Sequence, residues 1–353
     1  MDTTAQALDL EIQKLETKIK NTKLPPELLE KTQGMIDIIN LSIKQGGSVT
    51  NLESIANYID VITKIPFEGE TQSNLDLNIA RQALNKNHYG LISVKDRILE
   101  YLSSLILNIK KGQKRNRAPI ICLVGLVGTG KTTLSISLAE TMGRKFERIP
   151  LGGMGDVRML RGQSRVFPDA EPGLIVKKLI HAGVKNPVIL LDELDRVTDA
   201  ARADIMGVLI ELLDPEQNME FMDHYVDYPI DLSQVLFIAT ANNTTNISTA
   251  VLDRLEIIQM PAYSDEEKIV IGKSFLFPKI SYNCGLPQDI IRIDDSVWPL
   301  IIRPLGYDSG IRSLERTIEG ICRKTARLLV EGKIKQNVIL TLTSQNIKEF
   351  LPA

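Results

Sequence analysis

Apolar residues in the N-terminal part of the chain recur at helical spacing. From Leu8 to Ile19 they stand three or four positions apart, until the Pro25-Pro26 pair interrupts the pattern. So short a heptad-like stretch does not establish a coiled coil, and we expect a helix that docks on its neighbours. The same periodicity predicts two further helices, at Glu27–Ile43 and Leu52–Ile62.

The middle of the chain changes from helical spacing to alternating strands and helices. After a polar linker at residues 68–74, helical spacing returns around Ala80 and Leu84 and again from Val94 to Leu107. Beyond residue 119, short β-rich runs alternate with segments of helix length, which is typical of a parallel, three-layer α/β sheet. The predicted strands are Ile120–Val124, Phe146–Pro150, Val188–Asp192, Val235–Ala241 and Ile257–Met260.

The last part of the chain is mainly helical from about Ser264 onward. Its longest amphipathic segment runs from Ile311 to Val330, and one late β-like run covers Asn337–Leu342. We therefore expect three parts. They are an N-terminal helical segment at residues 1–70, an α/β nucleotide-binding domain at 71–262 and a small, mostly helical lid at 263–353.

Composition narrows the functional classes. The 353 residues carry 42 Lys and Arg against 44 Asp and Glu, a net charge of −2. This balance does not indicate a nucleic-acid binder, although it leaves room for a local basic patch. Three widely separated cysteines suit neither a disulfide framework nor a zinc site and favour a reducing compartment. Without a signal-peptide pattern or a membrane-length apolar run, we expect a soluble intracellular protein.

The clearest chemical signal follows the first predicted strand, where the chain fulfils the P-loop pattern G-x-x-x-x-G-K-[ST]. Glycines let backbone N–H groups curl round phosphate oxygens at a helix N-terminus. Lys131 is expected to reach the β- and γ-phosphates of ATP, and Thr132 to bind Mg²⁺. The predicted nucleotide-binding residues here are Gly125, Gly128, Thr129, Gly130, Lys131, Thr132 and Thr133.

Polar residues also end two later strands. The run Val188–Leu191 is followed by Asp192 and Glu193, so a buried strand delivers two carboxylates to the edge where α/β sheets bind ligands. We expect Asp192 to bind Mg²⁺ and Glu193 to polarise the attacking water, as in a hydrolase. The third such strand ends in Asn242 and Asn243. An Asn there can orient the lytic water, and a turn-forming Asn pair explains the sequence equally well.

Several further stretches resemble the ATPase module of Lon proteases, within the AAA+ class, from about Leu24 to Phe350. They include Asn85–Leu91, Leu151-Gly152-Gly153, Asp214–Asn218, Asp223-His224-Tyr225 and Leu314-Glu315-Arg316. The resemblance implies an AAA+ fold with a three-layer parallel sheet and a helical lid. It also implies that ATP and Mg²⁺ are the cofactors and that the complete protein forms a hexameric ring.

The resemblance assigns roles to residues that spacing alone does not single out. Asn242 matches the sensor 1 position, Arg254 the arginine finger that reaches a neighbour's ATP, and Arg312 sensor 2 on the lid. Without the family, both arginines would be interpreted as surface residues. The segment that packs near adenine is matched by Tyr89, Gly90 and Leu91. His88 and His224 are expected to make structural hydrogen bonds.

The predicted substrate loop departs from the family pattern. Phe167 occupies the aromatic position that presses on substrate polypeptide, but Pro168, Asp169 and Glu171 follow where the family has small or apolar residues. Proline stiffens the loop, and the carboxylates change what the loop attracts. The alternative is a Phe167 side chain that packs on its own subunit.

The leading functional hypothesis is an ATP-driven motor that unfolds and translocates unfolded or tagged proteins for degradation. A DNA-remodelling AAA+ ATPase of the clamp-loader or helicase-loader type is the alternative, and a scaffold with a decayed ATPase is a third. We expect a cytoplasmic location, with the mitochondrial matrix as the alternative. Because the chain stops after the lid and carries no G-x-S-x-G motif, we expect no peptidase activity and interpret it as a fragment rather than a stand-alone module.

Overall fold

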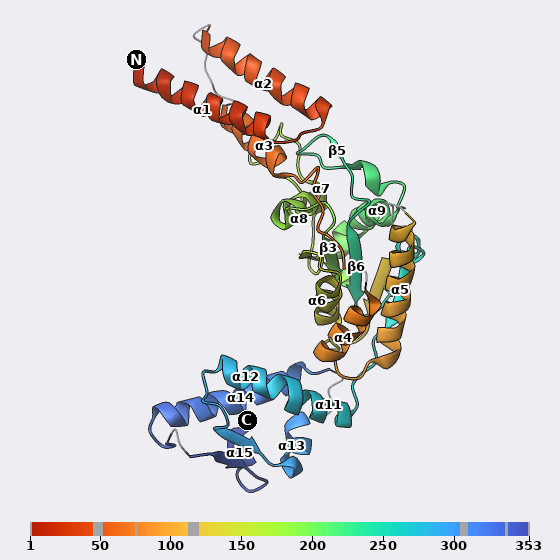
Figure 1. Cartoon of the computed structure of the whole chain (residues 1–353), viewed down its shortest axis with the longest axis vertical. Helices are drawn as coiled ribbons and strands as arrows, with labels where there is room; N and C mark the ends of the chain where they lie inside the picture. The colour runs from red at the N-terminus through yellow and green to blue at the C-terminus, as the bar shows by residue number, and fades with distance from the viewer. Residues whose placement is uncertain are drawn as a thin grey trace.

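The computed structural model of the chain describes residues 2–44, 52–74, 76–111, 120–303, 310–335 and 338–351. The N-terminal helices lie at one end of an elongated molecule, the sheet in the middle and the lid at the other end (Figure 1). The Gly46-Gly47 pair, at which we expect the second helix to break, lies outside the described residues. In the described part, no helix is long and apolar enough to cross a membrane.

Three helices form the N-terminal part: α1 (Asp2–Asn21), α2 (Pro26–Lys44) and α3 (Leu52–Lys64). Helix α1 buries Ile12, Leu15 and Ile19 against α2 and α3. The prediction of helices that dock on one another is therefore confirmed, and α2 begins at Pro26, where the first turn of a helix tolerates proline. Figure 1 shows α1 and α2 projecting beyond the rest of the chain.

Five parallel strands form the central sheet in the order β2-β3-β6-β1-β7. Their bounds are β1 (Ile120–Val124), β2 (Phe146–Pro150), β3 (Val188–Asp192), β6 (Leu236–Ala241) and β7 (Leu255–Gln259). Every residue of β1, β3 and β6 is buried, because helices cover both faces of the sheet. The predicted parallel α/β fold is confirmed.

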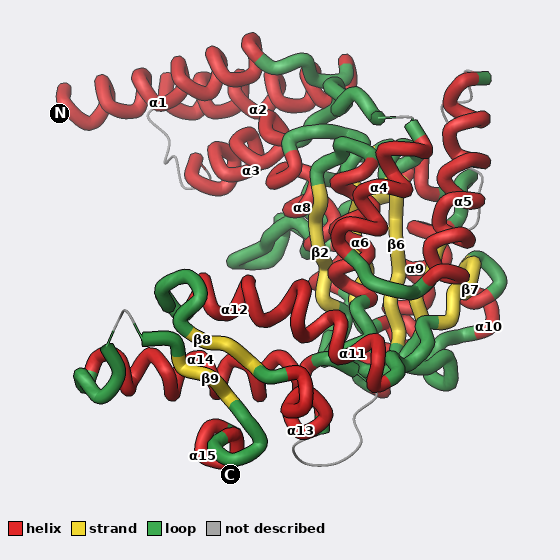
Figure 2. Tube along the Cα trace, turned by 60° about the horizontal axis from the view of Figure 1, so that its bottom comes forward, coloured by secondary structure: helices red, strands yellow, loops and turns green. Residues whose placement is uncertain are grey.

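The helices lie in two layers (Figure 2). Alternate residues of β1 show this, because Ile121 and Leu123 pack on one side of the sheet and Ile120 and Cys122 on the other. The first layer holds α4 (Leu77–Asn87), α5 (Ile92–Lys110) and α6 (Lys131–Thr141), and the second α8 (Leu174–Ala182) and α9 (Arg202–Leu213). Shorter elements are α7 (Arg158–Arg161), α10 (Thr249–Leu252) and the antiparallel pair β4 (Phe221–Met222) and β5 (Pro229–Ile230).

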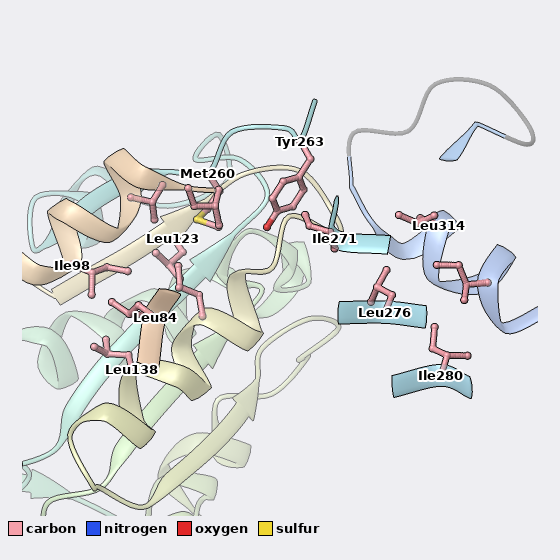
Figure 3. Close-up of a cluster of buried hydrophobic side chains, with 14 of the residues drawn as sticks. Leu84, Ile98, Leu123, Leu138, Met260, Tyr263, Ile271, Leu276, Ile280 and Leu314 are labelled. Carbon is pink, nitrogen blue, oxygen red and sulfur yellow. The ribbon is translucent and has the colours of Figure 1, made fainter. Parts of the chain in front are cut away.

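The lid is built around one long helix. Its elements are α11 (Asp265–Ile271), α12 (Phe277–Asn283), β8 (Ile291–Ile293), α13 (Trp298–Ile302), α14 (Arg312–Val330), β9 (Leu340–Leu342) and α15 (Ile347–Phe350). Met260 and Tyr263 continue the apolar core from the sheet into the lid, where it reaches Ile271 and Leu314 (Figure 3). The lid therefore shares a core with the layer that contains α6.

The predicted elements differ from the structure mainly at their ends. Three of the five strands match the prediction, whereas β6 starts one residue later and β7 lies nearer the N-terminus than expected. The late β-like run is shorter than predicted, and it pairs in parallel with β8, a strand that the sequence did not indicate. The P-loop helix begins at Lys131, directly after Gly130, which caps it in the left-handed conformation.

Candidate functional site

The C-terminal ends of β1, β3 and β6 meet at one edge of the sheet, where they open into a cavity of about 170 Å³. This edge is where open α/β sheets bind their ligands. The cavity is lined by Val127, Gly128, Gly130, Lys131, Thr132, Thr133, Arg148, Asp192, Glu193, Thr240, Ala241, Asn242, Ile311, Arg312 and Glu315. Residues of the P-loop, the three neighbouring strands β2, β3 and β6, and the lid thus face one another.

The P-loop has the backbone conformation that its glycines allow. Gly128 and Gly130 have φ angles of 83° and 90°, at which any residue other than glycine would be strained. A Cβ atom on Gly125 would lie 2.7 Å from the carbonyl oxygen of Met260, so this position also needs glycine. Of the predicted residues, Gly125 and Thr129 build the turn without lining the cavity. The Thr129 carbonyl accepts a hydrogen bond from the Tyr263 hydroxyl at 3.2 Å.

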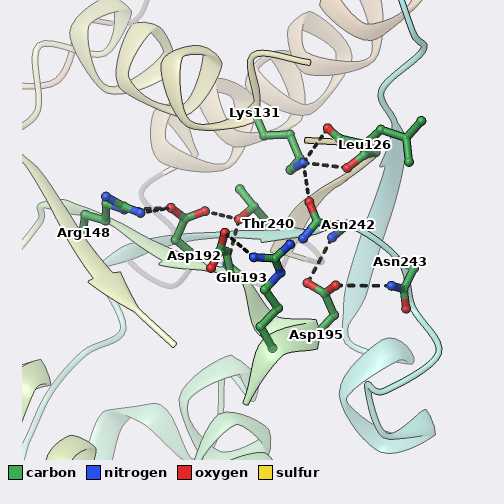
Figure 4. Close-up of polar contacts among 11 residues, drawn as sticks. Leu126, Lys131, Arg148, Asp192, Glu193, Asp195, Thr240, Asn242 and Asn243 are labelled. Atoms are coloured by element: carbon green, nitrogen blue, oxygen red, sulfur yellow. Dashed lines mark hydrogen bonds and ion pairs between the residues drawn. The ribbon is translucent and has the colours of Figure 1, made fainter. Parts of the chain in front are cut away.

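The Lys131 ammonium bonds to the loop that surrounds it. Its Nζ donates to the carbonyl oxygens of Gly125 at 2.6 Å and Leu126 at 3.0 Å, and to Oδ1 of Asn242 at 3.1 Å (Figure 4). Burial lowers the pKa of Lys131, and the carboxylates of Asp192 and Asp195 oppose that shift. The cation is therefore held at the cavity wall by acceptors that phosphate oxygens can replace.

Both carboxylate oxygens of Asp192 have protein partners. Arg148 on β2 donates to Oδ2 through Nε at 2.7 Å and Nη2 at 2.6 Å, and the Thr240 hydroxyl donates to Oδ1. The Thr240 oxygen in turn accepts the Glu193 backbone N–H at 3.0 Å. One threonine on β6 thus holds both acidic residues at the end of β3 (Figure 4).

Glu193 is held in a strained backbone conformation, with a φ of 62° that non-glycine residues seldom adopt. A Cβ atom on Gly152 would lie 2.4 Å from Glu193 Oε2, so the glycine leaves space for this carboxylate. Arg196 approaches Glu193 Oε1 at 3.6 Å. The side chain remains half-buried at the cavity, where a carboxylate can accept a proton from water or polarise it.

The two asparagines after β6 have different surroundings. The Asn243 side chain accepts the Thr245 N–H at 3.0 Å and so forms a turn. Asn242 faces the cavity and is positioned by Asp195, whose Oδ1 accepts its backbone N–H at 3.0 Å. Its Nδ2 is buried and has no hydrogen-bond partner in the described part of the chain. A buried donor without a partner costs free energy, and a ligand oxygen in the cavity would relieve that cost.

These features fit a phosphate chain with its magnesium ion. The Lys131 ammonium, the unpaired Asn242 Nδ2 and the P-loop backbone supply donors, while Thr132 and Asp192 supply oxygens for Mg²⁺. Within the described ranges, no three His, Cys, Asp or Glu side chains come together as a metal site. An ion at this edge would therefore need water and phosphate oxygens to complete its coordination.

The lid lies directly on the P-loop. The Ile311 N–H donates to the Gly128 carbonyl at 3.1 Å, and a Cβ on Gly310 would lie 2.4 Å from the Val127 carbonyl oxygen. Arg312, the first residue of α14, lines the cavity, with Glu315 one turn later. The cavity volume is below the range of roughly 300–1,000 Å³ common for ligand pockets.

Three sets of predicted residues lie outside this cavity. Arg254 donates to the Ala250 carbonyl at 2.9 Å and to Asp214 Oδ2 at 3.1 Å instead. Tyr89, Gly90 and Leu91 connect α4 to α5 and approach the lid, because a Cβ on Gly90 would lie 2.5 Å from Glu267 Oε1. Phe167 and Pro168 are exposed on the loop between α7 and α8, and 56% of the Phe167 surface is accessible. Packing of Phe167 into its own subunit is therefore not observed.

His88 makes a structural contact through its ring, whereas His224 is exposed and bonds through its backbone. The His88 ring lies 2.9 Å from the Ser137 hydroxyl on α6, and burial lowers its pKa to about 4. The His224 backbone N–H donates to the Arg161 carbonyl at 2.7 Å, at the base of the Phe167 loop.

Sequence reasoning missed Arg148, Thr240 and Asp195. Their roles depend on β2 and β6 flanking β3, and the strand order is not visible in the sequence. The signal for Thr240 was a hydroxyl in an otherwise apolar strand, and the signal for Asp195 was a third acid after Asp192 and Glu193. Arg148 in the middle of β2 gave no comparable signal.

Two family descriptions match the chain. Residues 121–262 match the ATPase family associated with various cellular activities (AAA), and residues 282–338 match the Lon protease AAA+ ATPase lid domain. The first match covers the sheet and the P-loop, and the second covers all of α14. They agree with the expected α/β domain that is followed by a lid.

Curated relatives named Lon protease are similar over nearly the whole chain. The protein from Desulforamulus reducens is 40% identical over 333 residues, which are 94% of this chain and 40% of the relative. That from Lawsonia intracellularis is 40% identical over 97% of this chain and 40% of its own length. That from Clostridioides difficile is 41% identical over 92% of this chain and 40% of its own length. The chain thus spans about 40% of the length of these relatives.

Proposed function

This chain is an AAA+ ATPase module of the Lon type, and we propose that it hydrolyses ATP to unfold and translocate protein substrates. The observation that carries the proposal is the convergence of Lys131, Asp192, Glu193 and Asn242 on one cavity at the C-terminal edge of the sheet. They come from the P-loop and from the ends of β3 and β6, and in the proposed reaction they supply cation, metal ligand, base and amide donor.

In the proposed reaction, this chain's residues bind phosphate and orient water. Lys131 exchanges its carbonyl acceptors for β- and γ-phosphate oxygens. Glu193 polarises the attacking water, and Asn242 orients that water through the amide nitrogen that has no partner in the described structure. Thr132 and Asp192 would hold Mg²⁺, which neutralises charge on the phosphates when bound. Arg148 and Thr240 keep the Asp192 carboxylate at the cavity.

The remaining predicted residues act at the edges of this site. Tyr89, Gly90 and Leu91 are proposed to contact adenine, and Arg312 to connect bound nucleotide to lid position. Arg254 is proposed to reach the nucleotide of a neighbouring subunit. Its place outside its own chain's cavity supports that proposal. The complete protein would then work as a homo-oligomer, a hexameric ring in the Lon pattern.

The proposed substrates are unfolded or tagged polypeptides, contacted by Phe167 with Pro168 stiffening the loop behind it. The exposure of the Phe167 ring supports this assignment. The name of the relatives supports unfolding for degradation as the purpose.

The matches do not favour the DNA-remodelling alternative. Bacterial relatives support the cytoplasm rather than the mitochondrial matrix. The domain boundaries 1–70, 71–262 and 263–353 remain our proposal.

Nucleotide titration tests the central step. Lys131→Ala should abolish binding of a fluorescent ATP analogue, because Lys131 is the side-chain cation that the P-loop itself offers to phosphate. Lys348→Ala removes an exposed lysine on α15 and should leave the affinity at the wild-type value. Equal affinity in Lys131→Ala and the wild type would contradict the P-loop assignment.

A further inference from the structure

The loop that carries Phe167, residues 162–173, is tied together at its base. The Gln163 N–H donates to the Glu171 carbonyl at 3.1 Å, which joins the two limbs of the loop. A Cβ on Gly173 would lie only 1.9 Å from the Leu160 carbonyl oxygen, so the limbs approach as closely as glycine permits. Gly162 has a φ of 74°, a conformation that glycine adopts readily.

A buried carboxylate fastens this base to the segment at residues 223–227. Asp223 Oδ2 accepts the Gly173 N–H at 2.8 Å, and Oδ1 accepts the backbone N–H groups of Tyr225 at 2.8 Å and Val226 at 3.1 Å. Asp223 is fully buried, and burial raises its pKa although the three N–H donors oppose that shift. The loop base is therefore held by an internal hydrogen-bond network.

The outer part of the loop is held by a helix that precedes it by about a hundred residues. The Arg165 guanidinium carbon lies 3.8 Å from the ring centroid of Tyr58 on α3, within stacking distance. Tyr58 is fully buried, and its hydroxyl donates to the Val226 carbonyl at 2.9 Å. Its ring also contacts that of Tyr225, with the centroids 6.1 Å apart.

Tyr58 thus connects the two supports of the loop. Its hydroxyl bonds to the segment that Asp223 fixes, and its ring carries Arg165, two residues before Phe167. A second bond from the N-terminal helices reinforces the segment, because Lys31 Nζ on α2 lies 2.8 Å from Asp227 Oδ2. Phe167 is exposed, and its backbone N–H closes a turn on the Ser164 carbonyl at 3.0 Å.

We propose that Tyr58 is a positioning residue for the substrate loop: stacked on Arg165, it holds Phe167 in place from the N-terminal helices. The inference rests on the proposed function, in which Phe167 contacts a polypeptide. It predicts that loss of the Tyr58–Arg165 contact frees the outer limb of the loop while Asp223 still holds its base. Polypeptide binding then weakens more than nucleotide binding, because the nucleotide cavity uses neither residue.

Trypsin cleavage after Arg165 tests the contact itself without requiring ATPase activity. Tyr58→Phe keeps the stacked ring and loses only the bond to Val226, so it should be cut little faster than the wild type, whereas Tyr58→Leu should be cut about tenfold faster, as expected for loss of a partly buried cation–π contact. Cleavage after Arg323, on the lid helix α14, is the internal control. Equal rates at Arg165 in Tyr58→Leu and Tyr58→Phe would overturn the proposal.

A second variant decides the matter if Tyr58→Leu unfolds, which faster cleavage at Arg323 would reveal. Arg165→Gln removes the same contact from the half-buried loop side, and Arg158→Gln removes a neighbouring exposed cation that pairs with Asp156 instead. Hydrogen exchange across residues 163–173 should speed up about tenfold in Arg165→Gln and much less in Arg158→Gln. Equal exchange in the two variants would overturn the proposal.

Enzyme kinetics then separate positioning from a general structural role. With a reduced, carboxymethylated protein as the unfolded polypeptide, Arg165→Gln should raise the KM for polypeptide stimulation of ATP hydrolysis several-fold more than the KM for ATP. A proportional change in both constants would contradict the positioning role. If polypeptide does not stimulate the wild type, the proposed function fails, and the cleavage and exchange results still decide whether the contact exists.

Discussion

At the proposed nucleotide cavity, the candidate side chains hold one another in place, whereas at the Phe167 loop the side chain proposed to contact substrate is exposed and its supports hold only the backbone. Lys131 bonds to Asn242, and Asp192 bonds to Arg148 and Thr240, all within one cavity. Phe167 projects from a loop that Asp223 fixes at its base and Arg165 holds against Tyr58.

From this difference we expect the cavity and the Phe167 loop to respond differently to substitution. Cavity residues share partners, so the removal of one leaves a buried donor or acceptor unpaired and changes the positions of the others. The Phe167 ring shares few contacts, so its removal should subtract one interaction with substrate and little else. Large effects are therefore expected around the cavity and small ones at the tip of the loop.

The largest effect is expected from a residue in neither place. Arg254→Ala should slow ATP hydrolysis by about 10³–10⁵-fold if Arg254 stabilises charge on a neighbour's nucleotide. Specific activity of the wild type should also rise with protein concentration, because the site is then completed by assembly. Arg97→Ala removes a surface arginine that pairs with Glu256 and is the matched control. Concentration-independent activity in a chain that light scattering finds monomeric would refute the arginine-finger role.

Glu193→Gln should slow hydrolysis by about 10²–10⁴-fold, because an amide cannot take a proton from water. Nucleotide affinity should persist, since the amide keeps the shape of the side chain beside Gly152. Single-turnover hydrolysis and nucleotide titration separate the two effects. Glu315→Gln neutralises another carboxylate at the cavity and should slow hydrolysis far less. Wild-type turnover in Glu193→Gln would exclude Glu193 as the base.

The nucleotide cavity was the easier place to predict from sequence. A P-loop and an acidic strand end are local patterns, and parallel strands bring their C-terminal ends to one edge. The contacts of Arg148 and Thr240 with Asp192 could not be predicted, because they depend on the order of β2, β3 and β6 in the sheet. Tertiary pairing decides that order. The strand β8 was not predicted, because its three residues are too few for their hydrophobic periodicity to distinguish a strand from the surrounding helices.

The supports of the Phe167 loop could not be predicted at all. Nothing local connects Tyr58 to Arg165, and Asp223 looks like any surface acid until the fold buries it. The family resemblance pointed to the segment Asp223-His224-Tyr225 without a reason for it. The structure supplies one, because this segment ties the base of the loop to α3 through Val226 and Tyr58.

A smaller effect should distinguish the contact of His88 with α6 from the base of the Phe167 loop by their response to acid. Burial, reinforced by the Lys95 charge, lowers the pKa of His88 from 6.5 to about 4. Its contribution to stability is therefore present above pH 6.5 and is lost as the pH falls through 4, a loss of about 3 kcal/mol in the free energy of unfolding. Asp223 has the opposite sign, since its raised pKa makes its contribution greatest in acid.

Chemical denaturation between pH 7 and pH 4 measures the His88 effect. His88→Gln keeps a polar side chain near Ser137 but cannot titrate, so it should flatten this part of the stability profile. His224→Gln is the control, because the His224 side chain is exposed and the residue bonds to Arg161 through its backbone. The assignment fails if His88→Gln and the wild type lose the same stability over this range.

The smallest effect is expected at Phe167, and it tests whether the loop acts by a single contact. Phe167→Ala should reduce the rate of ATP-driven unfolding of a tagged, marginally stable fluorescent reporter by about fivefold, the value of one aromatic contact of ~1 kcal/mol. Unfolding by the wild type should itself be weak, because Asp169 and Glu171 place carboxylates on the same loop as the ring. Val166→Ala alters the neighbouring side chain, which is 88% exposed, and should change the rate much less. Loss of reporter fluorescence with ATP present measures the unfolding rate with all three proteins.

Identical unfolding rates in Phe167→Ala and Val166→Ala would remove the ring from the mechanism. A loss as large as that of Glu193→Gln would instead place the loop within the coupled network of the cavity, and the distinction between the two places would not hold.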